Sequence, residues 1–422
     1  MGKRNPTKTK ETDDSRSNIR WLYAIICVHI VLGLIYWHYT PFGASPDEDV
    51  HARYVQKLVN NRALLVFDVN DRENYEAHQP PLYYILAVPF YMIGRVGLIR
   101  LLSLILGAIS ILTIYYAVKN SFGENKLAIS AAGFTAFLPT HVMLSSSVSN
   151  DMLCELIFGA CLLVTAIMIR KGLGLKMTAC LGIILGAGLL SKSTCVLLFP
   201  VVILAYFQIW QRGKAPGKTV ILHLITAMVI SLVVGGWWLV RNQILYGDPL
   251  VITQFQQAFQ HTAKPEFWLS HGWTWWMYCA LVIGWTFASF WGVFGYMKVF
   301  MPAWVYLALA AITLSAKIGS IKGICEERVK SEENKDVILI YGLTLFLVIL
   351  TFVKFNIVYF QAQGRYFYPA IVPISVFWSL GINRLLPKSK RHFMPYLVIG
   401  IPVIVQIIAI TTCIVSEMPY YM

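Results

Sequence analysis

Charged side chains are scarce in this sequence, and many of them stand at the ends of apolar stretches. A carboxylate in such a place could take a proton from a hydroxyl group. Arginine could hold a phosphate through its planar fork, and lysine could do so as a point charge. A set with both signs beside a membrane would suit group transfer from a phosphate-bearing lipid to a hydroxyl. The candidates are the carboxylates Asp47, Glu48 and Asp151, the cations Arg100, Lys192, Arg241 and Arg365, and His51, His78, Tyr83 and Tyr366 as further substrate contacts.

Each candidate also has an ordinary structural role open to it. Charges near a bilayer are nevertheless costly and usually functional, and these residues come from separate segments that share one position, at the ends of apolar stretches. That shared position favours a single site. The structural alternatives are a helix cap or first turn for Asp47, Glu48 and Asp151, an interfacial anchor for Lys192, Arg241 and Arg365, a solvated position for His51, a loop position for His78, and an aromatic belt for Tyr83 and Tyr366.

The composition places the candidates in a membrane protein. Of the 422 residues, 57% are hydrophobic and only 13% are charged, which is too few charges for the surface of a soluble protein of this length. Several stretches reach the roughly 20 apolar residues that a helix needs to cross a bilayer. The formal net charge of +14 comes from lysine and arginine in short loops between those stretches, so it predicts orientation in a membrane rather than nucleic-acid binding.

The eight cysteines lie almost entirely within apolar stretches. No CxxC motif and no paired spacing in a polar loop is present. The cysteines therefore indicate neither a disulfide framework nor a zinc site.

Loop charge predicts the topology of the chain. Five basic loops are expected to be cytosolic, at residues 119–126, 170–176, 212–218, 317–335 and 388–391. This arrangement predicts about eleven transmembrane helices, with the N-terminus inside the cell and the C-terminus outside. The predicted spans are 19–39, 98–118, 127–147, 152–169, 178–190, 194–210, 220–240, 302–316, 337–358, 367–385 and 393–415.

Two further apolar segments do not fit this count. Residues 81–94 are short for a crossing, and residues 273–297 are rich in tryptophan. Both are expected to lie in the outer interface or to be re-entrant, and a hairpin of short spans is the alternative. The predicted units are a disordered cytosolic tail (1–18), a catalytic membrane module (19–240) with a first outer loop (40–100), a second outer loop (241–301) and C-terminal membrane helices (302–422).

Short motifs in a fixed order resemble the GT-C superfold of membrane glycosyltransferases. The resemblance is closest to the branch that contains protein O-mannosyltransferases, aminoarabinose transferases acting on lipid A, and related uncharacterised bacterial proteins. Each motif is short, but their order covers residues from about 20 to 390. The motifs are PDE (46–48), HQPPLYY (78–84), LIRLLS (98–103), SNDM (149–152), LSKST (190–194), WLVRN (238–242), YGDP (246–249) and QGRY (363–366).

The resemblance implies inverting transfer of a sugar from a polyprenyl-phosphate donor on the non-cytosolic side of the membrane. It implies that Asp47 or Glu48 is the catalytic base, and that Asp151 matches a second family carboxylate near the donor. Arg100 and Arg365 match positions that could meet the lipid phosphate, and Lys192 and Arg241 are further candidates. These relatives often carry lysine or histidine directly before the double proline, whereas Gln79 stands there in this chain; the role of His78 is therefore open.

Cofactors and partners can also be predicted, and one alternative function remains. No cofactor is required; a divalent metal could bind the carboxylates, but it is not favoured because several cations are available for the phosphate. The expected partners are the lipid-linked donor, membrane lipids, and a glycan, lipid or protein acceptor. A transporter or flippase of a lipid-linked sugar is the main alternative, although transporters place their polar groups near the bilayer midplane.

Overall fold

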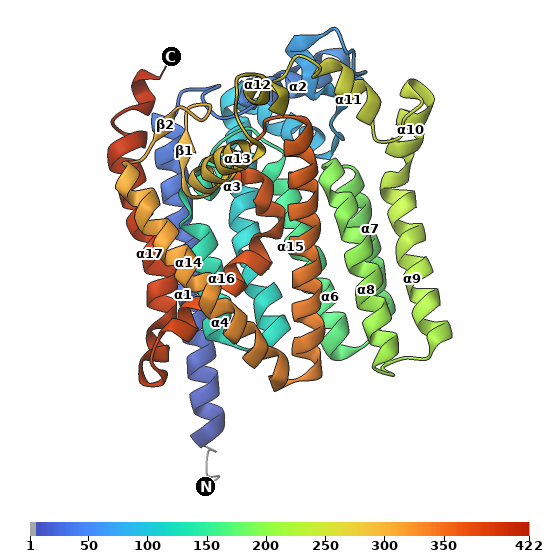
Figure 1. The fold of residues 1–422 in the computed structure, drawn as a ribbon. Coiled ribbons are helices and arrows are strands. Elements are labelled where there is room, and N and C mark those ends of the chain that lie inside the picture. The colour runs from blue at the N-terminus through green and yellow to red at the C-terminus, as the bar shows by residue number, and fades with distance from the viewer. Residues whose placement is uncertain (1–5, 422) are drawn as a thin grey trace.

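The computed structural model shows a bundle of long, roughly parallel helices, with the two chain ends at opposite ends of the bundle (Figure 1). It describes the backbone of residues 6–421, and the side chains from residue 19 onward apart from Arg72. Residues 1–5 lie outside the described part of the chain, and the side chains of residues 6–18 are not described either. The disorder predicted for residues 1–18 therefore stays a prediction. The bundle helices are α1 (Pro6–Tyr39), α3 (Leu82–Phe122), α4 (Asn125–Ala136), α5 (Pro139–Ser145), α6 (Asp151–Lys171), α7 (Leu175–Leu189), α8 (Leu198–Gln211), α9 (Gly217–Ser231), α10 (Trp237–Tyr246), α14 (Ala303–Lys330), α15 (Glu332–Val358), α16 (Ile371–Leu385) and α17 (Met394–Ala409).

The end of the bundle away from the N-terminus carries most of the irregular structure, and we call it the upper end, as it is drawn in Figure 1. The short elements there include a two-stranded antiparallel sheet in which Val293 pairs with Phe300. The elements at this end are α2 (Glu48–Asn61), η1 (Arg72–His78), η2 (Ser193–Leu197), α11 (Ile252–Ala258), α12 (Pro265–Ser270), α13 (Trp275–Trp291), β1 (Val293–Phe294), β2 (Val299–Phe300) and η4 (Gly364–Ala370). Four further short helical turns are η3 (Leu232–Gly236), η5 (Lys388–Phe393), η6 (Ile410–Ile414) and η7 (Met418–Tyr420).

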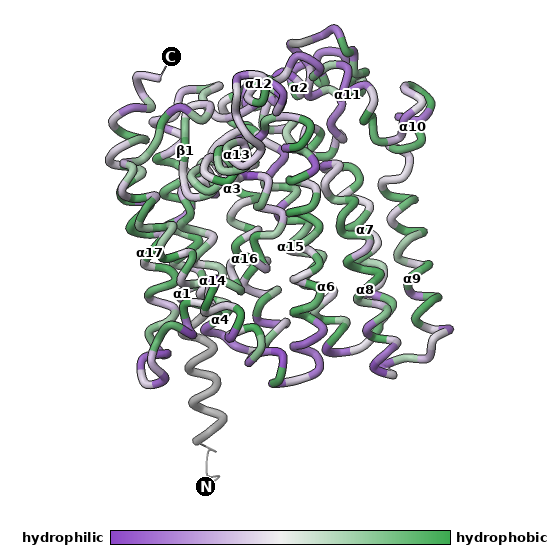
Figure 2. The backbone as a smooth tube through the Cα atoms, in the orientation of Figure 1, coloured by the Kyte–Doolittle hydropathy of each residue, from purple (hydrophilic) through white to green (hydrophobic). Residues whose placement is uncertain are grey.

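The hydropathy of the helices confirms the all-helical membrane class. Apolar residues fill the middle of the bundle, and polar residues gather at both ends (Figure 2). Within the described chain, eight helices are long and apolar enough to cross a membrane, or nine if α4 and α5, which meet at a bend of 67°, form one span. All eleven predicted spans fall on helices or bent helix pairs, but α7 and α16 are short. The count of eleven crossings therefore stays a prediction.

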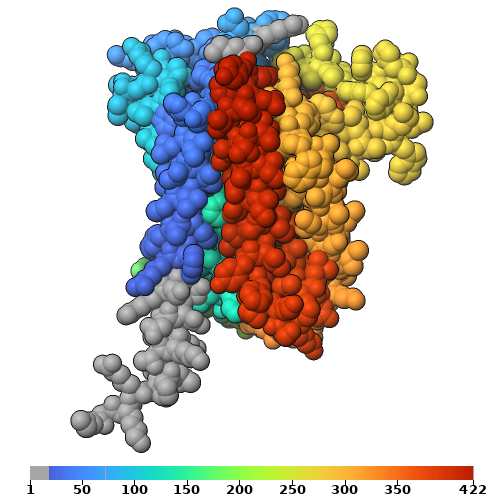
Figure 3. All heavy atoms as spheres, turned by 90° about the vertical axis from the view of Figure 1, so that its left-hand side faces the viewer, coloured from blue at the N-terminus to red at the C-terminus, as the bar shows by residue number. Residues whose placement is uncertain are grey.

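The two segments left out of the predicted spans lie at the upper end. Residues 81–94 fall in the first part of α3, which breaks at Gly94 and Arg95 before it continues into the predicted span 98–118. Arg95 has a left-handed backbone (φ 56°). Residues 273–297 contain α13 and β1. Seen from the side, upper segments project on both sides of the bundle, and the red column of the C-terminal helices runs between them down this face beside α1 (Figure 3). Gln406 on α17 donates to the Tyr36 hydroxyl on α1 at 2.9 Å.

A buried polar cluster joins four helices inside the bundle. His141 on α5 contacts Glu155 on α6 at 3.0 Å, and Ser110 on α3 donates to the same carboxylate at 2.5 Å. The ring of His29 on α1 lies 5.0 Å from the His141 ring. Because unpaired polar groups are costly in hydrocarbon, this cluster fixes α6, which carries Asp151 at its upper end.

Small residues allow α14 and α16 to approach each other closely. A Cβ atom at Gly381 would clash with the carbonyl oxygen of Ala316, and one at Gly319 would clash with the carbonyl of Gly381. Ser320 also donates to the carbonyl of Phe377 across the contact at 2.7 Å. Backbone packing of this kind, through small residues, is a main source of helix association in membranes.

Replacing Gly381 with alanine should therefore destabilise the protein, because overpacking a close contact costs about 1–3 kcal/mol. Thermal unfolding of the purified protein in detergent measures the loss. Gly342→Ala in α15 is the matched control, since a Cβ atom there meets open space. Equal melting temperatures for the two variants would contradict the packing described.

Candidate active site

The adjacent carboxylates Asp47 and Glu48 face different surroundings. Asp47 precedes α2 with a left-handed backbone (φ 61°), and its side chain makes no capping hydrogen bond to the helix. The Glu48 side chain is fully buried and accepts two hydrogen bonds from Arg100, each at 2.7 Å. It also accepts the backbone N–H groups of Gly43 and Val148, both at 3.0 Å. The two neighbours therefore cannot have the same function.

Arg100 uses all of its donors inside the protein. A guanidinium has five N–H donors. Two of them bind Glu48, and the others bind the carbonyl oxygens of Trp37, Thr40 and Pro41 at 3.0–3.2 Å. The geometry thus argues against the predicted roles of Arg100 in phosphate binding and of Glu48 as a base. Both residues instead fix the loop that carries Asp47.

Asp47 belongs to a row of alternating charges at the upper end of the bundle. It accepts a hydrogen bond from Arg365 at 2.5 Å, across 318 positions of sequence, and another from the Tyr75 hydroxyl at 2.6 Å. Arg365 also lies 3.5 Å from Asp151, which pairs with Lys192. The row Asp47–Arg365–Asp151–Lys192, called the charge row below, is formally neutral. It joins the start of α2, η4, the start of α6 and the turn before η2.

The charges around this row determine how the nearby groups titrate. Burial alone would raise the pKa of Asp47, but the charge of Arg365 holds it below its ordinary value. Burial raises the pKa of Glu76 and lowers those of His51 and His78, the last to about 4. Burial would also lower the pKa of Lys192, but Asp151 raises it instead. At neutral pH, Asp47 is therefore ionised beside neutral histidines, and the two carboxyls Asp47 and Glu76 are shifted in opposite directions.

Three members of the charge row, Asp47, Arg365 and Lys192, line a cavity of about 540 Å³. Its polar part also includes Tyr75, Glu76 and Asn150, whereas its other walls are largely apolar. The cavity can therefore accommodate a ligand with a polar head and an apolar tail. The apolar wall comes from η2, α11 and α15 and includes Val196, Leu197, Ile252, Phe255, Phe259, Val348, Phe352, Phe355 and Val358.

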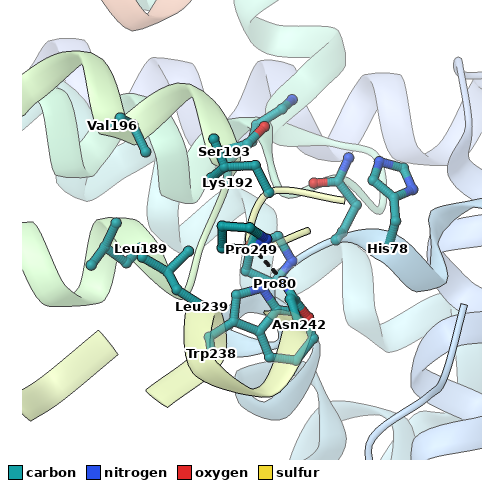
Figure 4. A pocket seen from close by; sticks show the side chains of 12 residues that line it. His78, Pro80, Leu189, Lys192, Ser193, Val196, Trp238, Leu239, Asn242 and Pro249 are labelled. Atoms are coloured by element: carbon teal, nitrogen blue, oxygen red, sulfur yellow. Dashed lines mark hydrogen bonds between the residues drawn. The ribbon is translucent and has the colours of Figure 1, made fainter. Parts of the chain in front are cut away.

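A smaller recess of about 30 Å³ adjoins this cavity, and His78 and Lys192 line both. Figure 4 shows these two residues with Trp238 and Asn242, which donates to the carbonyl of Pro249 at 3.1 Å. The recess has room for little more than water. The larger cavity is therefore the candidate active site.

Comparisons with known proteins relate this architecture to a family. Residues 78–238 match the family model described as dolichyl-phosphate-mannose-protein mannosyltransferase. ArnT from Cupriavidus metallidurans in the apo state aligns over 96% of this chain and 78% of its own, with a TM-score of 0.60 and 15% identity. ArnT bound to undecaprenyl phosphate aligns over 88% and 62%, with a TM-score of 0.59 and 16% identity. This chain has the GT-C fold.

A third GT-C structure supports the same assignment. Archaeal AglB from Archaeoglobus fulgidus, in complex with an inhibitory peptide and a dolichol-phosphate, aligns over 92% of this chain and 55% of its own, with a TM-score of 0.56 and 12% identity. The chain thus spans about half of AglB and 62% of the lipid-bound ArnT chain. No curated protein sequence matches it. The resemblance predicted from the motifs is confirmed, and the chain is an integral membrane protein.

The GT-C cavity includes six of the predicted site residues in its wall. Asp151 contacts two of them through the charge row, and His51 is held by the Tyr84 hydroxyl at 2.8 Å. Tyr366 lies against Arg365, with its ring centre 5.5 Å from the guanidinium carbon. The six lining residues are Asp47, His51, His78, Lys192, Arg365 and Tyr366.

Two further predicted residues, Tyr83 and Arg241, do not line the cavity. The Tyr83 hydroxyl is buried against Ser103 at 2.8 Å and accepts the backbone N–H of Ser149 at 3.1 Å. Arg241 donates to the carbonyl of Leu65 at 2.6 Å and stacks on Trp238. The geometry therefore argues against substrate contact by Tyr83 and phosphate contact by Arg241, and both hold the upper segments together.

Several lining residues were not predicted. Tyr75 and Glu76 lie in the same outer loop as His78, and Gln79 accepts a hydrogen bond from Asn150 at 3.3 Å. Lys354 also lines the cavity from α15. Its signal in the sequence was a charge inside an otherwise apolar span. In the described part of the chain, no group of three or more His, Cys, Asp or Glu could hold a metal ion; the expectation that no metal is needed stays a prediction.

Replacing Arg100 with methionine should destabilise the protein by about 3–5 kcal/mol, because Glu48 would remain buried without its partner. Thermal unfolding in detergent measures the loss. Arg53→Met is the control, since Arg53 pairs with Asp49 on the exposed surface, where an ion pair contributes about 0–1 kcal/mol. The double variant Glu48→Leu/Arg100→Met should recover part of the loss. A similar melting temperature for Arg100→Met and wild type would contradict the structural role.

Proposed function

We propose that this protein is an inverting glycosyltransferase. It moves a sugar from a polyprenyl-phosphate donor to an acceptor hydroxyl on the non-cytosolic side of the membrane. The observation that carries this proposal is the cavity, in which an ionised carboxylate and several cations adjoin an apolar wall. The ArnT structure bound to undecaprenyl phosphate and the AglB structure in complex with a dolichol-phosphate support a donor of this class.

Asp47 is the proposed catalytic base. Its side chain is 24% exposed, whereas that of Glu48 is 0% exposed and its oxygens are occupied by hydrogen bonds. The acceptor hydroxyl gives its proton to the Asp47 carboxylate as its oxygen bonds to the anomeric carbon. The bond from that carbon to the phosphate oxygen breaks at the same time. A single displacement of this kind inverts the anomeric configuration and requires no covalent intermediate with the protein.

Nearby cations stabilise the departing lipid phosphate, whose negative charge increases as it leaves. Arg365 and Lys192 lie at the polar end of the cavity, and burial strengthens their interaction with a charge that develops there. Asp151 holds these two cations in place through its two oxygens. It is therefore a positioning residue in this proposal.

The proposed orientation follows from charge at the lower end of the bundle. Basic residues of the predicted cytosolic loops pair there with acidic ones, as in the contacts Arg212–Asp336 and Lys214–Glu333. An excess of lysine and arginine in short loops indicates the cytosolic side. The cavity at the upper end would then face outward.

Asp47→Asn should lower turnover of a polyprenyl-phosphate sugar by about 10²–10⁴-fold, the usual contribution of a positioned base. The measurement is release of polyprenyl phosphate by the reconstituted protein. Asp49→Asn is a matched control two positions away, because Asp49 pairs with the exposed Arg53. Normal turnover by Asp47→Asn would rule out this base. A wild-type protein that consumes no polyprenyl-phosphate sugar would contradict the enzyme proposal, and movement of intact donor across the bilayer would favour a flippase.

The pH profile tests the pairing of Asp47 with Arg365. Because Arg365 holds the pKa of Asp47 down, the base stays ionised, and kcat/KM should fall only in strong acid. Removing the cation in Arg365→Gln raises that pKa, so the acid limb of the profile should move to higher pH, whatever the residual rate. Arg53→Gln should leave the limb in place. An unmoved limb in Arg365→Gln would show that Asp47 does not determine it.

A further inference from the structure

Lys354 occupies an unusual place for a lysine. It lies about one turn before the end of α15, inside the apolar span Glu332–Val358, and it is exposed. It lines the cavity beside Phe352, Phe355 and Val358. A charged residue within an apolar span is costly and is retained chiefly where it has a partner or a ligand.

The other cavity cations already have carboxylate partners. Arg365 contacts Asp47 and Asp151, and Lys192 pairs with Asp151. Across the side chains that the structure describes, Lys354 makes no ion pair and no hydrogen bond. It is thus the cavity cation whose charge no neighbouring carboxylate offsets.

The ion pairs of the cavity do not include Lys354. The two carboxylates and two cations of the charge row cancel. Glu76 is a further carboxyl of the wall, and burial raises its pKa; it makes no ion pair with Lys354 among the described side chains. Lys354 is therefore a cation of this cavity that has no direct counter-charge among the described side chains, and it lies on the helix that supplies much of the apolar wall. This arrangement is complementary to an anion attached to an apolar chain.

We propose that Lys354 binds the phosphate of the lipid-linked ligand while the lipid chain lies along α15. This inference rests on the proposed function and names a residue through which the same cavity holds its donor. The ammonium group acts as a point charge that attracts the phosphate. Arg365 and Lys192 can then keep their carboxylate partners while the ligand binds.

The test compares binding of a polyprenyl phosphate with binding of the corresponding polyprenol, which has the same chain but no charge. Both ligands are titrated against the purified full-length protein in detergent. Wild type should prefer the phosphate, and Lys354→Gln should reduce that preference on the order of tenfold or more. Lys354→Arg should retain most of it. Lys335→Gln, on the opposite end of the same helix, is the matched control and should behave as wild type.

The outcomes separate the inference from the function on which it rests. An undiminished preference for the phosphate in Lys354→Gln overturns the inference alone, and it is the result expected of a lysine that merely extends its charge to the membrane surface. A wild-type protein that binds the two lipids equally overturns the proposed donor, and the inference with it. Because Lys354 is exposed, its variants should melt as wild type does, so a change in ligand preference does not reflect misfolding.

Discussion

The buried ion pair between Glu48 and Arg100 is the constraint on which the upper end of this protein depends. It joins the first residue of α2 to the middle of α3, and Arg100 also binds carbonyls in and just after the last turn of α1. Burying this pair is costly unless every donor and acceptor is satisfied, and here all five guanidinium donors are used. With Glu48 held inside the bundle, the left-handed backbone at Asp47 turns the adjacent carboxylate toward the cavity.

The charge row extends this arrangement to helices that are distant in sequence. Each member neutralises its neighbours, so four charges can be buried together at the upper end of an apolar bundle. The same balance keeps Asp47 ionised, because Arg365 is its direct partner. A neutral row cannot by itself attract an anionic lipid strongly. The unpaired charge of Lys354 and the apolar wall of α15 supply what the row lacks.

The sequence predicted much of this site because the relevant motifs stand at helix ends. Loop charge placed Asp47, Asp151, Lys192 and Arg365 at one level, and the structure brings them into contact. The sequence could not show which of Asp47 and Glu48 is the base, because adjacent carboxylates have the same local sequence context. They differ in their partners from distant segments, which are Arg365 for Asp47 and Arg100 for Glu48. The roles of Arg100 and Arg241 escaped prediction for the same reason, since their partners, Glu48 and backbone carbonyls, belong to segments distant in sequence. The two-residue strands β1 and β2 are too short to show the alternation of apolar and polar residues by which a strand is predicted.

An experimental structure of the full-length protein with a bound polyprenyl phosphate tests the central claim most directly. The account predicts phosphate density inside the cavity, within reach of Lys354 and the Lys192–Arg365 side of the charge row, with the lipid chain against α15. Asp47 should remain paired with Arg365 and accessible to an acceptor, and Glu48 should remain paired with Arg100. Phosphate bound at the opposite end of the bundle, or a lipid held by Arg100 with Glu48 released, would contradict the account.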